Sequence, residues 1–166
     1  MEKISFKSLV DRHSAPVFNA ALRILGNPNN AHDVHQEVFL AVLRRWHKFD
    51  AKTKWPAYLY RATVRKAMEY VKRSRREVPL SSLNDRAVVK ENPDGPMRTG
   101  ELQHELLRRL SKLPKRQADV FVLSRIEGLD NRRVAEIVGC SPEAARVHLC
   151  QAAKRLSSEL RTFLEK

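Results

Sequence analysis

Residues 128–143 read GLDNRRVAEIVGCSPE, and this stretch decides the fold of the C-terminal part of the chain. Its two glycines, the second being Gly139, are suited to the left-handed backbone conformation that ends a helix. Asp130 and Ser141 are residue types that cap the first turn of a helix, and Pro142 fits the first helical position. Two helices joined by so short a turn form a helix-turn-helix. The sequence therefore predicts this motif, and DNA binding is the first functional hypothesis.

The helix that begins at Pro142 is expected to run to about Phe163. Its apolar residues recur every three or four positions and predict one buried stripe: Ala145, Leu149, Ala152, Leu156 and Leu160. Residues near the start of such a helix face base edges in the major groove. The candidate residues for reading duplex DNA lie at its cap and on its outward face: Ser141, Pro142, Glu143, Arg146, Val147, Cys150 and Gln151. Arginine and glutamine can read guanine and adenine, but each one taken singly could also be an ordinary solvated residue.

Composition favours a polyanionic partner and argues against catalysis. The chain has 32 lysines and arginines against 19 acidic residues, a net charge of +13. It has five glycines, no phosphate-cradling glycine-rich loop, no His-Glu-x-x-His and no nucleophile elbow, so we expect neither an enzyme nor a cofactor. His32 and His35 could pair on a metal, but with only Asp33 nearby we expect none. The spacing of Cys140 and Cys150 does not suggest a disulfide framework.

The sequence also predicts two domains and no membrane insertion. Residues 78–100 are rich in proline, serine, asparagine and glycine and lack a sustained apolar period, so they are expected to form a flexible linker. Helical apolar patterns lie on both sides. We therefore expect an all-α protein with two small helical domains, residues 1–77 and 101–166, the second containing the helix-turn-helix. Without a run of 18 apolar residues or a signal peptide, the chain is expected to be cytoplasmic.

The first domain is expected to contain several helices. Pro16 should break or kink the first of them. Asn30 and Asp33 resemble a capping box at the start of the next. The apolar face of that helix is expected to contain the following residues: Val34, Val38, Ala41 and Val42, widened by Phe39, Leu43 and Trp46. After a polar loop at residues 49–54, Pro56 is expected to begin a further helix.

Aromatic and basic residues share that further helix. Trp55, Tyr58 and Tyr60 come first, and seven basic residues follow: Arg61, Arg65, Lys66, Lys72, Arg73, Arg75 and Arg76. Aromatic rings beside a basic track suit single-stranded nucleic acid, because rings stack on bases and cations bind phosphates. An aromatic core edge with a solvated basic face is the alternative. We expect at least one of these aromatic residues to be exposed and to stack on an unpaired base, favour Trp55 and Tyr58 for this role, and expect Tyr60 to pack inward next to Leu59.

Three segments carry a resemblance to the extracytoplasmic-function (ECF) sigma factors of bacterial RNA polymerase. Residues 33–40 (DVHQEVFL) resemble the D-x-x-Q-E-x-F segment of region two, and residues 57–61 (AYLYR) resemble its A-W-L-Y-R run. Residues 113–156 resemble region four almost throughout. The order and spacing of these segments are more specific than any one of them.

The resemblance implies a mechanism and partners. The helix with Asp33, Gln36 and Glu37 would dock on core RNA polymerase. The loop at residues 49–54 and the helix after it would capture the melted −10 element through five residues: Trp55, Tyr58, Arg61, Arg65 and Lys66. The recognition helix would read the −35 element as duplex DNA. An anti-sigma factor would be a further partner.

The chain departs from the family in its recognition helix. Residues 144–152 read AARVHLCQA where the family often has TVKSRLHRA, and Arg65 stands where asparagine is common. The promoter sequence that this chain prefers therefore cannot be inferred from that of a relative. A stand-alone helix-turn-helix regulator would explain residues 101–166 but would leave residues 33–39 and 55–76 without a role. A structural nucleic-acid-binding protein would explain the charge but not the turns.

Overall fold

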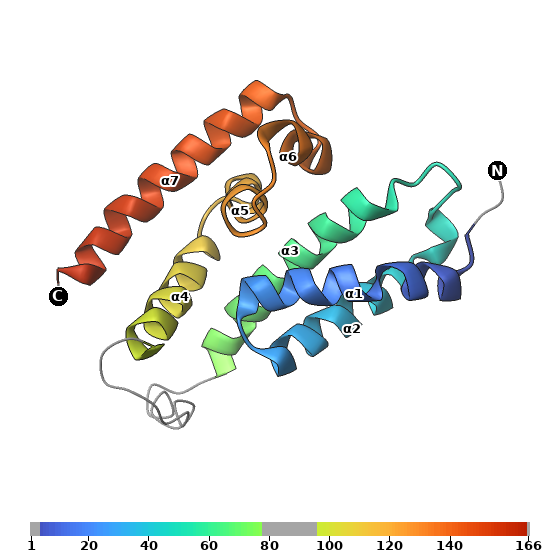
Figure 1. Ribbon diagram of the computed structural model, residues 1–166, viewed down its shortest axis with the longest axis horizontal. Coiled ribbons are helices and arrows are strands. Elements are labelled where there is room, and N and C mark those ends of the chain that lie inside the picture. Colours follow the sequence, from blue (N-terminus) through green and yellow to red (C-terminus); the bar gives the residue numbers. More distant parts are fainter. Residues whose placement is uncertain (1–3, 78–95, 166) are drawn as a thin grey trace.

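The computed structural model describes residues 4–77 and 96–165, which contain helices and no strand. Figure 1 shows two groups of helices side by side. The first group consists of α1 (Phe6–Leu25), α2 (Pro28–Arg44), the 3-10 turn η1 (Trp46–Lys48) and α3 (Trp55–Glu77). The second consists of α4 (Pro96–Leu110), α5 (Lys115–Phe121), the π-helical turn η3 (Val122–Ile126), α6 (Asn131–Val138) and α7 (Pro142–Leu164).

Helix α1 does not break at Pro16, contrary to expectation. Ser5 caps the helix by accepting a hydrogen bond from the Ser8 N–H, and one helix continues to Leu25. Proline removes one backbone hydrogen bond. The apolar residues on both sides of it are buried against the same core, Leu9 before it and Val17 after it. That packing keeps the two halves of α1 in one helix.

The residue that caps helix α2 lies three residues before the expected capping box. The side chain of Asn27, not Asn30, accepts hydrogen bonds from the backbone N–H groups of residues 29 and 30. Pro28 occupies the first helical position. Asn30 lies within the first turn, where its side chain accepts a hydrogen bond from the Tyr70 hydroxyl at 2.8 Å. The expected cap was therefore wrong, although the helix that follows it was right.

The core of the first group forms where α1, α2 and α3 pack on one another. Helices α1 and α2 supply five of the largest fully buried side chains there: Leu9, Ile24, Val34, Val38 and Val42. Helix α3 adds Val64 and Ala67, and it starts at Trp55, one residue before the expected start. Leu43 was expected to widen this buried face, but its side chain is 48% exposed. The apolar face of α2 is therefore narrower than its sequence suggests.

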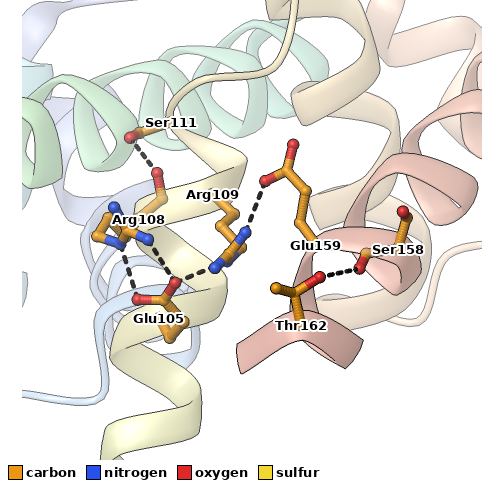
Figure 2. A network of polar contacts seen from close by, with 7 residues as sticks. All are labelled: Glu105, Arg108, Arg109, Ser111, Ser158, Glu159 and Thr162. Carbon is orange, nitrogen blue, oxygen red and sulfur yellow. Dashed lines mark hydrogen bonds and ion pairs between the residues drawn. The ribbon is translucent and has the colours of Figure 1, made fainter. Parts of the chain in front are cut away.

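Most of the expected linker falls on residues that the structure does not describe. Its residues 78–95 lie outside the described residues, and residues 96–100 belong to α4. The helix packs against α7 through Arg109, which binds Glu105 within α4 and Glu159 of α7 (Figure 2).

The two groups of helices also contact each other. Buried residues from both belong to one continuous apolar core. The Arg23 guanidinium in α1 donates two hydrogen bonds, at 2.9 and 2.7 Å, to the Glu127 carboxylate at the end of η3. Arg65 in α3 lies 3.6 Å from the Asp119 carboxylate in α5. Helices α4, α5 and α6 of the second group all contact α3.

Candidate nucleic-acid interface

The helix-turn-helix predicted from the sequence consists of α6 and α7. The Asp130 carboxylate accepts a hydrogen bond from the Arg133 N–H and caps α6. The Ser141 hydroxyl accepts one from the Ala144 N–H and caps α7. Gly139 ends α6 with φ of 78°, a left-handed conformation that costs other L-residues about 1–2 kcal/mol. Both predicted caps and the predicted glycine stop are confirmed.

The turn is held rigidly against the helices on either side of it. The backbone N–H groups of Gly139 and Cys140 donate to the Ala135 carbonyl at 2.8 and 3.1 Å. The Asn131 amide donates to the Pro142 carbonyl at 3.3 Å. Between α6 and α7 the core is filled by a set of buried apolar side chains: Val134, Ala135, Ile137, Val138, Ala145, Ala152 and Leu156. The start of α7 is therefore fixed in direction.

All seven predicted recognition residues are exposed at the start of α7 or on its outward face: Ser141, Pro142, Glu143, Arg146, Val147, Cys150 and Gln151. Gln151 differs from the others, since its side-chain oxygen accepts a hydrogen bond from the buried Gln117 of α5 at 3.0 Å. Reading adenine needs both the oxygen and the amide nitrogen of a glutamine. Gln151 therefore has to break a contact within the protein before it can read a base in this way.

A basic groove of 760 Å³ follows α7 from its second turn to its C-terminal end. Its walls carry four cationic side chains: Arg125, Arg146, Lys154 and Arg161. Cys150, Ser157 and Ser158 contribute smaller side chains to the lining. Sequence reasoning found Arg146 but not Arg125, which comes from η3 and reaches this groove only through the tertiary fold. Such a row of cations, beginning beside the recognition face, suits the phosphates of a nucleic acid.

The aromatic residues near the start of α3 form a cluster with those of η1. The Trp55 ring stacks on Trp46 with centroids 5.6 Å apart and lies 4.8 Å from Phe49. Tyr58 meets Phe49 and Trp55 edge-on at 5.0 and 5.9 Å. Trp55 is only 9% exposed, which argues against the preference for it as a stacking residue, whereas Tyr58 is half-buried. The predicted contrast with Tyr60 does not hold either, because Tyr60 is half-buried as well.

The predicted basic residues of α3 differ in what they face. Arg61 and Arg65 are half-buried near the Asp119 carboxylate of α5, and Lys66 binds Glu69 of its own helix at 3.0 Å. Burial raises the pKa of Asp119, and the charges of Arg65 and Arg61 oppose that rise. The acidic side chain thus lies buried beside two arginines that were predicted to bind DNA. No sequence pattern indicates this pairing, because its partners are far apart in the chain.

Helix α2 carries an outward stripe that includes two of the three predicted polymerase-binding residues. Asp33, Gln36, Leu40 and Leu43 recur at steps of three, four and three, and all four are exposed. The third predicted residue, Glu37, accepts a hydrogen bond from Arg73 of α3 at 2.6 Å. The two leucines, each 48% exposed, were missed because an apolar residue in a helix is first assigned to the core. We call these four residues the α2 stripe.

Within residues 4–77 and 96–165, no group of three or more histidine, cysteine or acidic side chains is placed to hold a metal ion. His35 is hydrogen-bonded to the Ser14 hydroxyl at 2.8 Å, and His32 lies against the Phe18 ring. The helices of the described residues include none long and apolar enough to cross a membrane.

Two family models match this chain, one in each group of helices. Residues 9–77 match Sigma-70 region 2, and residues 103–156 match Sigma-70, region 4. The chain is 22% identical to the ECF RNA polymerase sigma factor SigW of Bacillus subtilis, over 95% of this chain and 89% of that protein. It is 28% identical to the ECF RNA polymerase sigma factor SigE of Mycolicibacterium smegmatis, over 94% of this chain and 62% of that protein.

Solved structures share the fold. A structure of CnrH in complex with the cytosolic domain of CnrY superposes with a TM-score of 0.53 at 23% identity, covering 95% of this chain and 88% of that one. The sigma factor RpoE in complex with the anti-sigma factor NepR from Bartonella quintana gives 0.52 at 16% identity, covering 94% and 96%. With both sigma regions matched in order and full-length relatives of one kind, the chain belongs to the ECF sigma factors.

Proposed function

We propose that this sigma factor directs bacterial RNA polymerase to its promoters with two modules, one that reads the −35 element as duplex and one that captures the −10 element as single strand. The modules correspond to residues 1–77 and 101–166, joined by residues 78–100. The observation that carries the proposal is the recognition face of α7, whose seven predicted residues are all exposed and whose first turn is capped by Ser141. Sigma factors are not enzymes, so the function is one of binding and positioning.

The −35 module would insert the start of α7 into the major groove. Glu143, Arg146 and Val147 are exposed in its first two turns, within reach of base edges in such a geometry. The basic groove beginning at Arg146 would then follow the phosphates of one strand. Because phosphate contacts dominate affinity and base contacts supply specificity, one helix can serve both purposes.

The −10 module would use the start of α3. Of the two aromatic residues predicted to bind the −10 element, Tyr58 keeps an accessible surface for a base, while Trp55 packs against the Tyr58 ring. Lys66 is available to a phosphate at the cost of a surface ion pair with Glu69. Arg61 and Arg65 lie near Asp119, and a movement of α5 away from α3 would expose both arginines more fully to DNA. Separation of the two groups of helices would therefore favour strand capture by these arginines.

The α2 stripe would dock on core polymerase. It combines an acidic residue, an amide and two exposed leucines on one rigid helix, a mixture typical of protein interfaces rather than of a solvated helix face. Glu37 would contribute indirectly, since its contact with Arg73 ties α2 to α3. Both similar solved structures contain a bound partner, described as an anti-sigma factor in one of them, and we propose that such a factor also binds this chain.

Reconstitution with core polymerase tests the proposal. We expect the full chain to form a holoenzyme that starts transcription at a defined set of promoters, identified by sequencing transcript starts from genomic DNA. The double variant Asp33→Ala, Leu40→Ala should weaken holoenzyme assembly. The matched control Arg132→Ala, exposed on α6 in the other group of helices, should assemble normally. Sequence-specific duplex binding by the chain alone, with no affinity for core polymerase, would instead favour a stand-alone regulator.

A further inference from the structure

The first two turns of α7 expose one large apolar side chain. Among the described residues, six large apolar side chains are more than a third exposed: Leu40, Leu43, Leu102, Val147, Phe163 and Leu164. Only Val147, at 51%, lies at the start of the recognition helix. It follows Glu143 by four residues and precedes Cys150 by three, so the three share one helix face. This face points away from the buried stripe that begins with Ala145.

We propose that Val147 determines specificity by packing against the C5 methyl group of a thymine in the −35 element. The inference rests on the proposed duplex readout by α7. In the major groove, thymine is the base that presents an apolar group, whereas the other bases present hydrogen-bond donors and acceptors. A valine pressed against one of those polar edges would strip it of water without replacing the lost hydrogen bond. Val147 therefore selects thymine both by attraction and by exclusion.

The neighbours of Val147 strengthen this assignment. The oxygen of Gln151, one turn further on, is held by Gln117, which withdraws the residue best suited to read adenine. Arg146 lines the basic groove, where phosphates compete with bases for its guanidinium. What remains open at the centre of the recognition face is the apolar surface of Val147 with the small Cys150 beside it. The contact by which Val147 distinguishes one base from another is therefore apolar.

Replacing thymine by deoxyuridine tests the proposal, because the two differ by the C5 methyl group alone. The holoenzyme is first used to select a preferred −35 duplex from a library randomised over that element. Each thymine of the selected duplex is then replaced singly by deoxyuridine. At one position we expect wild-type affinity to fall about fourfold, which corresponds to the ~0.8 kcal/mol of one buried methyl group.

The variant Val147→Ala should lose this sensitivity at that position and keep it wherever other residues read a methyl group. We expect this variant to fold normally, because the Val147 side chain is exposed and alanine favours the helical conformation. The matched control is Leu164→Ala, which removes a more exposed apolar side chain from the far end of the same helix and should leave the deoxyuridine effect unchanged. Each protein is compared on two duplexes, so differences in active fraction cancel.

The outcomes separate this inference from the proposed function. A library that yields no preferred −35 sequence refutes duplex readout by α7 altogether. A preferred sequence whose deoxyuridine sensitivity is the same in wild type and Val147→Ala refutes the role of Val147 and leaves −35 readout standing. Loss of the sensitivity in Val147→Ala, with Leu164→Ala unchanged, supports the assignment.

Discussion

Replacing Glu105 by glutamine should weaken the attachment of α4 to α7. Figure 2 shows the carboxylate receiving Arg108 and Arg109 from its own helix, while Arg109 continues to Glu159 of α7. The Arg108 guanidinium donates at 2.7 and 2.5 Å, and Arg109 Nε donates at 2.6 Å. Glu105 is buried, so these hydrogen bonds are protected from water. The network therefore orients Arg109 toward α7.

The expected magnitude follows from the pKa of Glu105. Hydrogen bonding by Arg108, together with that by Arg109, lowers this pKa from 4.5 to about 2 against the opposing effect of burial. At 1.36 kcal/mol per pKa unit, the ionised carboxylate stabilises the fold by about 3 kcal/mol. Glutamine keeps a neutral acceptor for one of the arginines. We therefore expect Glu105→Gln to lower the free energy of unfolding by about 2 kcal/mol at pH 7.

The effect should also depend on pH. The pKa is lower in the folded state than in the unfolded state, so the contribution is complete above pH 4.5 and is lost as the pH falls toward 2. The difference between wild type and Glu105→Gln should accordingly shrink to less than half by about pH 3. Urea unfolding followed by far-UV circular dichroism at several pH values measures it.

Two controls make the experiment decisive. Both tryptophans, Trp46 and Trp55, lie in the first group of helices, so fluorescence reports unfolding there, apart from the network. The variant Glu159→Gln removes a half-exposed partner of Arg109 and should cost less than about 1 kcal/mol. A Glu105→Gln protein as stable as wild type at pH 7, or a difference that grows on acidification, would refute the reasoning.

Three further predictions follow from the described contacts. Trp55→Ala should destabilise the protein by about 3–5 kcal/mol in urea unfolding, because its side chain is buried. Tyr58→Ala should fold stably but transcribe better from a template with a pre-melted −10 bubble than from duplex. The reverse pattern would exchange the roles of the two residues. Asp119→Asn should change stability at pH 7 by less than about 1 kcal/mol, and should abolish the loss of stability that wild type shows as the pH rises from 3.8 through the raised pKa; strong destabilisation at pH 7 would contradict this. Gly139→Ala should lower stability by about 1–2 kcal/mol in thermal unfolding, and an unchanged midpoint would show that the turn adapts.

The helix-turn-helix could be predicted because its determinants are local. The cap at Ser141, the proline after it and the left-handed glycine each act within a few residues of the chain. The same is true of the buried stripe of α7, which depends only on helical periodicity. These features could be predicted from the sequence because each depends only on residues nearby in the chain.

Apart from the cap of α2, the errors occur where tertiary packing decides. That cap depends on a neighbouring residue, since Pro28 occupies the first helical position and Asn27 before it caps the helix. Burial on both sides keeps α1 continuous through Pro16. Trp55 has the composition of a stacking residue, but Trp46 and Phe49 from the preceding turn cover it. The side of a helix that is covered depends on partners that a single sequence does not identify.

The contacts between the two groups of helices were the least predictable and matter most for the proposed mechanism. Arg23 and Glu127 are 104 residues apart in the chain, and their side chains meet through two hydrogen bonds. The Glu127 side chain is only 2% exposed, so removing Arg23 would leave a buried carboxylate without this partner. This pair therefore resists separation of the two groups more strongly than the pair formed by Arg65.

The contact between Arg65 and Asp119 is weak enough for a DNA phosphate to replace it. At 3.6 Å the two groups are beyond hydrogen-bonding distance, and the arginine is 41% exposed, so the pair stabilises the closed arrangement by at most about 1 kcal/mol. Burial already disfavours the charge of Asp119. Under the proposed function, a phosphate can replace this carboxylate as the partner of Arg65 at little cost in free energy. Asp119 then becomes exposed to solvent as α5 moves away. Strand capture would thereby favour separation of the helices, which the shared apolar core and the contact between Arg23 and Glu127 oppose.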